Sequence, residues 1–211
     1  MNIKNPTQTA PLQSTSVIAF HDSGENANHA EPAWHWLGEN HRNNSLLWDE
    51  EDLARRTKAT AAEIMGNKRA IDGYNQARND ATERVDEYLL IALGLVDAAS
   101  ARTAAPVSKI AVGARLNSET AGSMIDRMSI MALKIKAMRA QTLRTDVDAA
   151  FIAQVTEKLT RLIEQRLDLG GCLDALLADS AAGRVYFKVY RQFKMYNDAR
   201  LNHILVAENK A

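Results

Sequence analysis

The 211-residue sequence has little cysteine, proline or glycine, and it carries no excess charge of either sign. Its single cysteine, Cys172, cannot form an internal disulfide, which favours a reducing compartment. Lys plus Arg and Asp plus Glu number 26 each, and this balance argues against a protein that binds a nucleic-acid backbone.

Long apolar runs are also missing. No stretch of about 18 apolar residues is present, so we expect no transmembrane helix. The N-terminus lacks a charged region followed by an apolar stretch and a small-residue cleavage site, so we expect no secretion signal. Together with the lone thiol, these absences predict a cytoplasmic protein.

Helix-forming residues fill most of the chain. Three of the four prolines fall within the first 32 residues, and no stretch alternates Val, Ile and Thr between turn residues as a strand would. We therefore predict an all-α protein, an antiparallel bundle of four to six helices without a sheet. The polar residues 1–14 are expected to be a disordered lead-in, followed by a single bundle domain over residues 15–208.

Apolar periodicity and capping signals place the helices. Thr60 and Glu63 match a capping box, in which each side chain satisfies a free backbone N–H of the other residue. Asp146 is the expected cap of a later helix, and Gly170-Gly171 is expected to break or bend it. The predicted helices cover residues 32–56, 61–99, 120–143, 147–169 with a continuation over 173–177, and 185–197 or as far as 205.

A polar stripe runs beside the apolar seam of the longest predicted helix. Residues three and four apart share a helix face, and this face carries Arg69, Asp72, Gln76, Asn79, Glu83 and Asp86. A stripe rich in amides as well as charges is unlike ordinary solubilising surface. It predicts either a groove that binds a polar ligand or a buried network that fixes helix register.

Three further segments combine charge with apolar or aromatic residues. Trp48 to Arg56 contains an i,i+4 pair of Glu51 and Arg55 beside an aromatic ring. Glu119 to Arg127 places Asp126 and Arg127 in an otherwise apolar helix, where a buried carboxylate needs a partner. Tyr190 to Asp198, which includes Lys194 and Asn197, alternates aromatics with cations and suits either a planar or phosphorylated ligand or an ordinary amphipathic helix.

Metal and catalytic signatures are absent from the sequence. His21, His29, His35 and His41 are not spaced to place two ligands on one helix face, so we expect no metal site. No Gly-rich phosphate loop and no nucleophile motif is present. We expect no cofactor, and the catalytic residues, if any exist, stay unknown.

The polar segments also resemble those of a known family. The matching residues are Asn44-x-x-Leu47-Trp48-x-Glu50-Glu51-Asp52-x-Ala54-Arg55-Arg56, Lys68-Arg69-x-Ile71-Asp72-x-x-Asn75-Gln76-x-Arg78-Asn79-Asp80, Glu119-Thr120-x-Gly122-Ser123-x-Ile125-Asp126-Arg127-x-Ser129-Ile130 and Tyr190-Arg191-Gln192-Phe193-Lys194-Met195-Tyr196-Asn197-Asp198-x-x-Leu201-Asn202. In this order they resemble a bacterial family known as domain of unknown function 4254, from about residue 18 to residue 205. The resemblance implies a setting among glycosyltransferases and cell-surface polysaccharide genes, and hence a sugar-nucleotide context.

We hypothesise that the polar residues meet in one ligand-binding cluster. Its members would be Glu51, Arg55, Arg69, Asp72, Gln76, Asn79, Asp126 and Arg127, with Lys194 and Asn197 as further ligand contacts. The arginines would contact an anionic group, and the carboxylates and amides would bind hydroxyls. The leading function is therefore a ligand-binding or accessory protein of cell-surface polysaccharide metabolism, with an anionic sugar or sugar nucleotide as ligand.

Two other functions remain open. One is a helix-mediated interaction module that forms a homodimer or docks to a glycosyltransferase, with an exposed methionine stripe as its surface. That stripe would consist of Met124, Met128, Met131 and Met138, which equally suit a core. The other is an enzyme that acts on a phosphorylated sugar with Asp72 or Asp126 as acid or base.

Overall fold

The structure, a computed structural model, describes residues 12–24, 32–193 and 198–209. It contains helices α1 (Ser14–Ser23), α2 (Pro32–Ala54), α3 (Ala61–Ala92), α4 (Ala98–Ala101), α5 (Ala121–Thr142), α6 (Ala149–Ala181) and α7 (His203–Glu208), and strands β1 (Arg115–Leu116) and β2 (Val185–Tyr186). The all-α prediction is confirmed. The two strands form a minimal parallel pair that the sequence patterns did not indicate.

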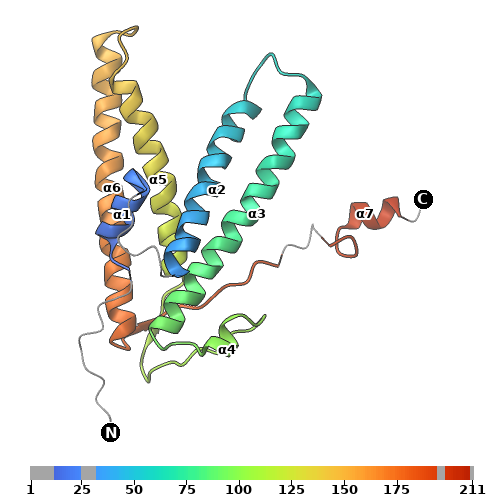
Figure 1. Ribbon diagram of the computed structural model, residues 1–211, viewed down its shortest axis with the longest axis vertical. Helices are drawn as coiled ribbons and strands as arrows, with labels where there is room; N and C mark the ends of the chain where they lie inside the picture. Colours follow the sequence, from blue (N-terminus) through green and yellow to red (C-terminus); the bar gives the residue numbers. More distant parts are fainter. Residues whose placement is uncertain (1–11, 25–31, 194–197, 210–211) are drawn as a thin grey trace.

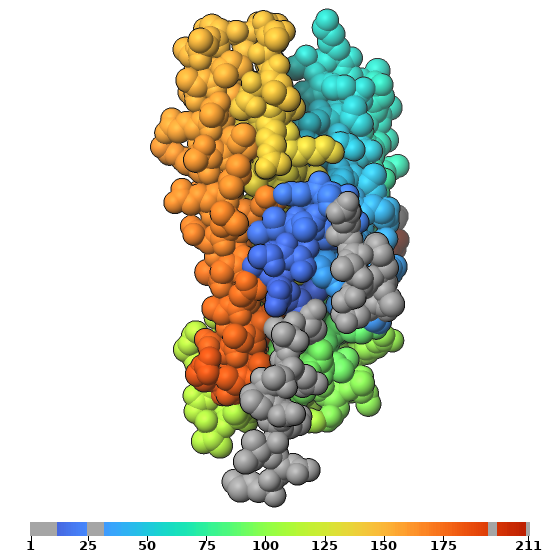
Figure 2. Space-filling view, turned by 60° about the vertical axis from the view of Figure 1, so that its left-hand side comes forward, coloured from blue at the N-terminus to red at the C-terminus, as the bar shows by residue number. Residues whose placement is uncertain are grey.

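Two antiparallel hairpins, α2–α3 and α5–α6, form a V (Figure 1). Their lower halves pack together, mainly through α5 against α2 and α3, and their turns diverge at the top. Helix α1 lies against α5 and α6, as the space-filling view shows (Figure 2). Helix α7 lies apart from both hairpins and buries none of its residues.

The helix starts follow local capping chemistry. The predicted capping box is present: Glu63 N donates to Thr60 Oγ1 (3.2 Å), and Thr60 N donates to Glu63 Oε2 (2.8 Å). The cap of α6 is Asp148, which accepts from the backbone N–H of Phe151, and not Asp146 as predicted. Helix α3 ends at Ala92, earlier than the predicted residue 99, and Gly94 follows it with φ of 70°.

The paired glycines neither break nor end α6, which continues through them to Ala181. Gly170 is instead a contact point. A Cβ on it would lie 3.1 Å from the Cβ of Ser14, so the missing side chain lets α1 approach α6 closely. Ser14 also donates to Asp174 from both its backbone N–H (2.9 Å) and its hydroxyl (2.6 Å), which fixes the start of α1 on this face.

The helix predicted from residue 185 onward is wrong for residues 185–193. This segment is extended: β2 pairs with β1, and the chain then continues without helix to residue 193. Val185, Phe187 and Val189 are buried, whereas the residues between them are more exposed, and this period of two is that of an extended strand. Residues 194–197 lie outside the described residues.

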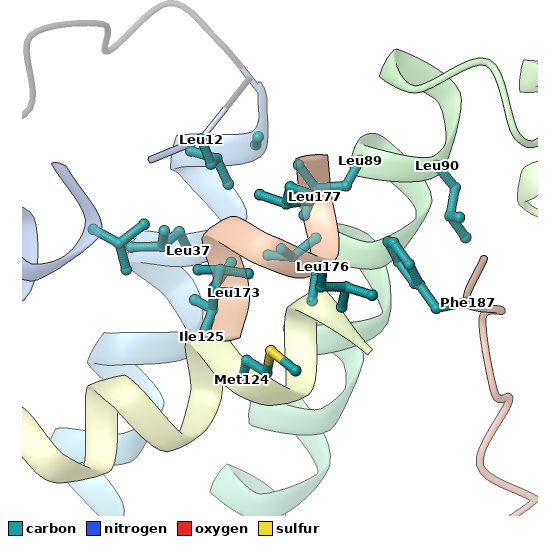
Figure 3. Close-up of a cluster of buried hydrophobic side chains, with 14 of the residues drawn as sticks. Leu12, Leu37, Leu89, Leu90, Met124, Ile125, Leu173, Leu176, Leu177 and Phe187 are labelled. Atoms are coloured by element: carbon teal, nitrogen blue, oxygen red, sulfur yellow. The ribbon is translucent and has the colours of Figure 1, made fainter. Parts of the chain in front are cut away.

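The apolar core lies where the two hairpins meet. Its side chains come from both hairpins and from the extended segment, and Figure 3 shows Leu12, Leu37, Leu89, Leu90, Met124, Ile125, Leu173, Leu176, Leu177 and Phe187. Leu12 belongs to the segment predicted to be a disordered lead-in, yet only 1% of its surface is exposed. For residues 1–11, which lie outside the described residues, that prediction remains untested. No helix of the described residues is both long and apolar enough to cross a membrane.

Candidate ligand-binding site

A polar network joins the two hairpins above the apolar core. The carboxylate of Asp126 on α5 accepts from the side-chain amides of two α2 residues, Asn40 (2.8 Å) and Asn44 (2.9 Å). Asn44 also donates to Ser129 (3.0 Å), and Asn40 donates to Thr82 on α3 (3.1 Å). Both asparagines are buried, so the network takes the place of water for groups that would otherwise be unpaired.

Two histidines extend the network towards α1. His41 Nδ1 lies 2.8 Å from the Ser129 hydroxyl, and the His41 ring centroid lies 4.8 Å from that of His21. Burial lowers the pKa of His21 well below its ordinary value, and the neighbouring His41 and Arg166 lower it further. Burial also lowers the pKa of His41. Both imidazoles are therefore neutral near pH 7.

Arg78 on α3 lies beside the carboxylate of Asp126. Its Nε is 3.9 Å from Asp126 Oδ1, and its terminal nitrogen donates to Asn79 (3.2 Å). Nε itself is buried and has no hydrogen-bond acceptor among the described residues. A buried N–H without an acceptor is costly, and it marks a place where a ligand or a water supplies the missing oxygen.

A pocket of about 340 Å³ opens next to this network, between α2, α3 and α5. We call it the polar pocket. It is lined by Asn44, Leu47, Trp48, Glu51, Asp52, Arg55, Asn75, Arg78, Ile130 and Leu133. Its size is at the lower end of the range of small-molecule sites.

Charges around the polar pocket are balanced. Arg55 donates to Glu51 across 2.7 Å, and Arg78 lies against Asp126 behind the pocket wall. The remaining charge in the lining, Asp52, is exposed. The pocket therefore offers hydrogen-bond donors and acceptors without a net positive field for an anion.

Two other hollows adjoin the polar pocket. The apolar hollow, of about 450 Å³, lies between α2, α5 and α6, and it shares Trp48 with the polar pocket. The α5–α6 groove, of about 1070 Å³, follows the two helices down to β2. Lys134, Leu162 and Gln165 line both the apolar hollow and the α5–α6 groove, so the two are continuous.

Five of the predicted site residues lie in or near the polar pocket. Glu51 and Arg55 line it, and Asp126 lies directly behind Asn44 and Arg78. Asn79 accepts from Arg78. Gln76, one residue beyond the lining position 75, donates to Asp80 (2.7 Å).

Three predicted residues lie elsewhere, so the single eight-residue cluster does not form. Arg69 and Asp72 are exposed and do not line the pocket, and Asp72 lies 3.8 Å from the ammonium group of Lys68. Arg127 pairs with Glu119 at the α5–α6 groove. The reason is that the two hairpins diverge towards their turns, so the face of α3 that is half-buried at residue 79 is exposed at residues 69 and 72 (Figure 1).

The C-terminal motif has a structural role in its described part. The Arg191 guanidinium donates to Glu83 (2.8 Å) and Glu87 (2.6 Å) on α3 and to the carbonyl of Ala101 (2.7 Å). These bonds hold the extended segment on α3, away from the polar pocket. Lys194 and Asn197, the two predicted ligand contacts of this motif, lie outside the described residues.

Asp86, also on the predicted polar stripe, is buried below the first turn of α5. It accepts from the backbone N–H of Gly122 (2.7 Å). Burial raises the pKa of Asp86 to about 7, hydrogen bonds from Thr120 and Gly122 oppose the rise, and Glu83 and Glu87 add to it. This carboxyl anchors α5 on α3, and Asp86 lines neither the polar pocket, nor the apolar hollow, nor the α5–α6 groove.

Most of the network was not predicted from the sequence. Asn40 and Thr82 were not singled out, and Ser129 entered only as part of a family motif, although three asparagines within five residues of α2 were a usable signal. Asparagine is a poor helix former and is favoured inside a helix only where its amide finds partners. In the described part of the chain, no group of three or more His, Cys, Asp or Glu side chains is arranged to hold a metal ion.

Comparison with known sequences gives a family but no characterised relative. Neither the curated proteins nor the solved structures include a significant match. The family described as "Protein of unknown function (DUF4254)" matches residues 34–189, which span α2 to the extended segment and include every residue that lines the polar pocket. The chain belongs to this family.

Proposed function

We propose that the protein binds a sugar in the polar pocket, as a ligand-binding or accessory protein of polysaccharide metabolism. The observation that carries the proposal is the lining itself: one indole ring, two side-chain amides, two arginines and two carboxylates surround a single small opening. The polysaccharide setting is what the family resemblance implies.

A sugar matches this lining in shape and in hydrogen bonding. A pyranose ring has a face of C–H groups that packs flat on an aromatic ring, and Trp48 supplies such a ring. Its hydroxyls both donate and accept, which suits the carboxylates of Glu51 and Asp52 and the amide of Asn75. Asn75 is half-buried, and its side-chain amide makes no hydrogen bond to the described residues, so it is free for a ligand.

Because the charges that line the polar pocket are balanced, we expect the pocket to bind the sugar ring of the ligand and not the ligand's anionic group. Arg55 is already paired with Glu51, and Arg78 lies near Asp126. Arg78 lines the pocket, and its buried Nε has no acceptor among the described residues. A phosphate of the ligand would then lie outside the polar pocket.

Calorimetric titration with glucose, glucose 1-phosphate and a uridine diphosphate sugar tests this proposal. We expect binding by at least one of them, and we expect Asn75→Ala to weaken it about tenfold because a ligand hydrogen bond is lost. Asp72→Asn, exposed on α3 and outside the pocket lining, is the control and should bind like the wild type. If no sugar binds, or if Asn75→Ala binds as tightly as the wild type, the proposal fails.

An interaction module is the second candidate, and the α5–α6 groove favours it. The groove lies on the side of α6 opposite to Gly170 and Asp174, which contact α1. Of the methionine stripe, Met124 and Met128 are buried in the core, while Met131 lines the groove and Met138 lines the apolar hollow. A homodimer or a glycosyltransferase docked here would appear as an increased mass in light scattering after size exclusion.

Catalysis by Asp126 or Asp72 has less support. Asp126 accepts two amide hydrogen bonds and lies behind the pocket lining, and Asp72 is exposed and does not line the pocket. A general base must reach the proton that it removes. An Asp126→Asn variant that still turns over a phosphorylated sugar would exclude this role for Asp126.

A further inference from the structure

The apolar hollow adjoins the polar pocket across one side chain. Trp48 lines both, so a ligand that lies on one face of the indole extends directly into the neighbouring hollow. The hollow is lined by Trp48, Lys134, Ala137, Met138, Gln141, Lys158, Arg161, Leu162 and Gln165. Its volume of about 450 Å³ exceeds that of the polar pocket.

The floor of the hollow is hydrocarbon. Ala137, Met138 and Leu162 are half-buried and supply it together with the indole of Trp48. Water on such a floor finds no hydrogen-bond partner, so covering it with an apolar group is favourable. The floor continues into the α5–α6 groove along Met131 and Leu169, which gives an extended chain room beyond the hollow.

The rim of the hollow is cationic, in contrast to the polar pocket. Lys134 and Lys158 are exposed and make no ion pair with the described residues, and Arg161 pairs only with Glu157 (2.5 Å) on its own helix. No carboxylate of the described residues lines the apolar hollow, and those that line the adjoining α5–α6 groove are Glu119, Asp168 and Asp179. Two unpaired ammonium groups above an apolar floor are complementary to an anion that carries a hydrocarbon chain.

We propose that the ligand is an amphiphile: a sugar whose phosphate is esterified to a hydrocarbon chain. The sugar ring lies in the polar pocket, the phosphate lies at Lys134 and Lys158, and the chain covers the floor of the apolar hollow. This inference rests on the proposed function for the sugar end. It explains why the pocket that fits the sugar has no net positive charge while its neighbour has unpaired cations.

Three soluble probes separate the parts of this ligand: glucose 1-phosphate, n-octyl phosphate, and the phosphodiester that joins glucose C1 to an octyl chain. Each is titrated below its micelle-forming concentration, with calorimetry as the readout. The diester should bind most tightly. Each methylene that becomes buried should strengthen binding about three- to fourfold, so a series from butyl to octyl diesters gives a steady rise in affinity.

Two lysine variants on α5 provide the matched test. Lys134→Gln removes the rim charge that the phosphate contacts, and we expect it to weaken the diester and octyl phosphate at least fivefold. Lys136→Gln, also exposed on α5 but outside the lining, should leave both unchanged. Neither lysine is paired with a described carboxylate, so both variants should fold like the wild type.

Each other outcome overturns the inference. If glucose 1-phosphate binds as tightly as the octyl diester, the hollow adds nothing, and the proposed function stands alone. If octyl phosphate binds but no sugar does, the proposed function fails and the ligand is not the amphiphile described. If light scattering shows a dimer that Lys134→Gln and Met138→Glu dissociate, a second copy covers the hollow.

Discussion

Asp86 offers a direct test of the packing of α5 on α3. Its carboxyl is buried and accepts from Gly122 N at the start of α5, and burial raises its pKa to about 7. The substitution Asp86→Asn keeps the accepting oxygen and nearly the same volume, but it cannot ionise. Any difference between the variant and the wild type that depends on pH then reports the cost of placing a charge at this position.

The sign and size follow from the two pKa values. An unfolded aspartate ionises near 3.8, and the folded protein holds the proton until about pH 7. Between these values the folded state binds more protons than the unfolded state, so this group makes the protein less stable as the pH rises. At about 1.4 kcal/mol per pH unit, the loss between pH 5 and pH 8 is about 3 kcal/mol.

Urea unfolding followed by far-ultraviolet circular dichroism measures this loss. The free energy of unfolding of Asp86→Asn relative to the wild type should increase by about 3 kcal/mol from pH 5 to pH 8, with an unchanged dependence on urea. Asp72→Asn, exposed and paired only with Lys68, is the control and should show no such change. Parallel pH profiles for Asp86→Asn and the wild type would refute the assignment of a raised pKa to Asp86.

Three further substitutions have effects that the packing predicts. Gly122→Ala would place a Cβ 2.6 Å from the carbonyl oxygen of Thr82, so we expect the free energy of unfolding to fall by about 2 kcal/mol or more. Thermal unfolding measures this change, and an unchanged melting temperature would contradict the close approach. Arg191→Met leaves the buried Glu87 without its partner on the extended segment, and we expect the free energy of unfolding in urea to fall by about 3 kcal/mol. The extended segment should also be cleaved faster by a protease. Equal cleavage rates would show that Arg191 does not hold this segment on α3. Both ring nitrogens of His21 are buried without a hydrogen bond to the described residues. Because the pKa of His21 is lowered in the folded protein, the wild type loses stability as the pH falls below about 6.5, the pKa of a free histidine. We therefore expect His21→Leu to be at least as stable as the wild type at pH 7.5 and to lose less stability at pH 5; an equal loss would assign the acid sensitivity to other groups.

The elements that were predicted correctly are those that depend on residues close together in the sequence. The capping box of Thr60 and Glu63 depends on residues three apart, and the structure contains it. The amphipathic seams of α3, α5 and α6 are likewise local, and all three helices are present. The segment after Gly183 was harder because its apolar residues fit both a period of two and a helical period, and burial of Phe187 by distant helices decides between them.

The site required information that no single helix contains. Asp126 was correctly expected to need a partner, but its partners are amides on α2, about 85 residues earlier, and not only the arginines of α3. Likewise, residues 69 and 72 share a face with residue 79, but the two hairpins diverge towards their turns, so this face is half-buried at residue 79 and exposed at residues 69 and 72. Periodicity gives the face of a helix, whereas the crossing of helices decides which part of that face is a site.

The two hairpins are joined where their lower halves pack, and their upper halves diverge, so a small rotation at the packed end would move the turns at the other end much further (Figure 1). From Asp126, which bonds to α2, helix α5 runs 16 residues to Thr142, or about 24 Å at 1.5 Å per residue. A rotation of about 10° about Asp126 would therefore displace that end of α5 by about 4 Å. The polar pocket lies between the two hairpins, with Trp48 on one and Leu133 on the other, so a ligand there would hold the angle of the V and set the separation of the two turns.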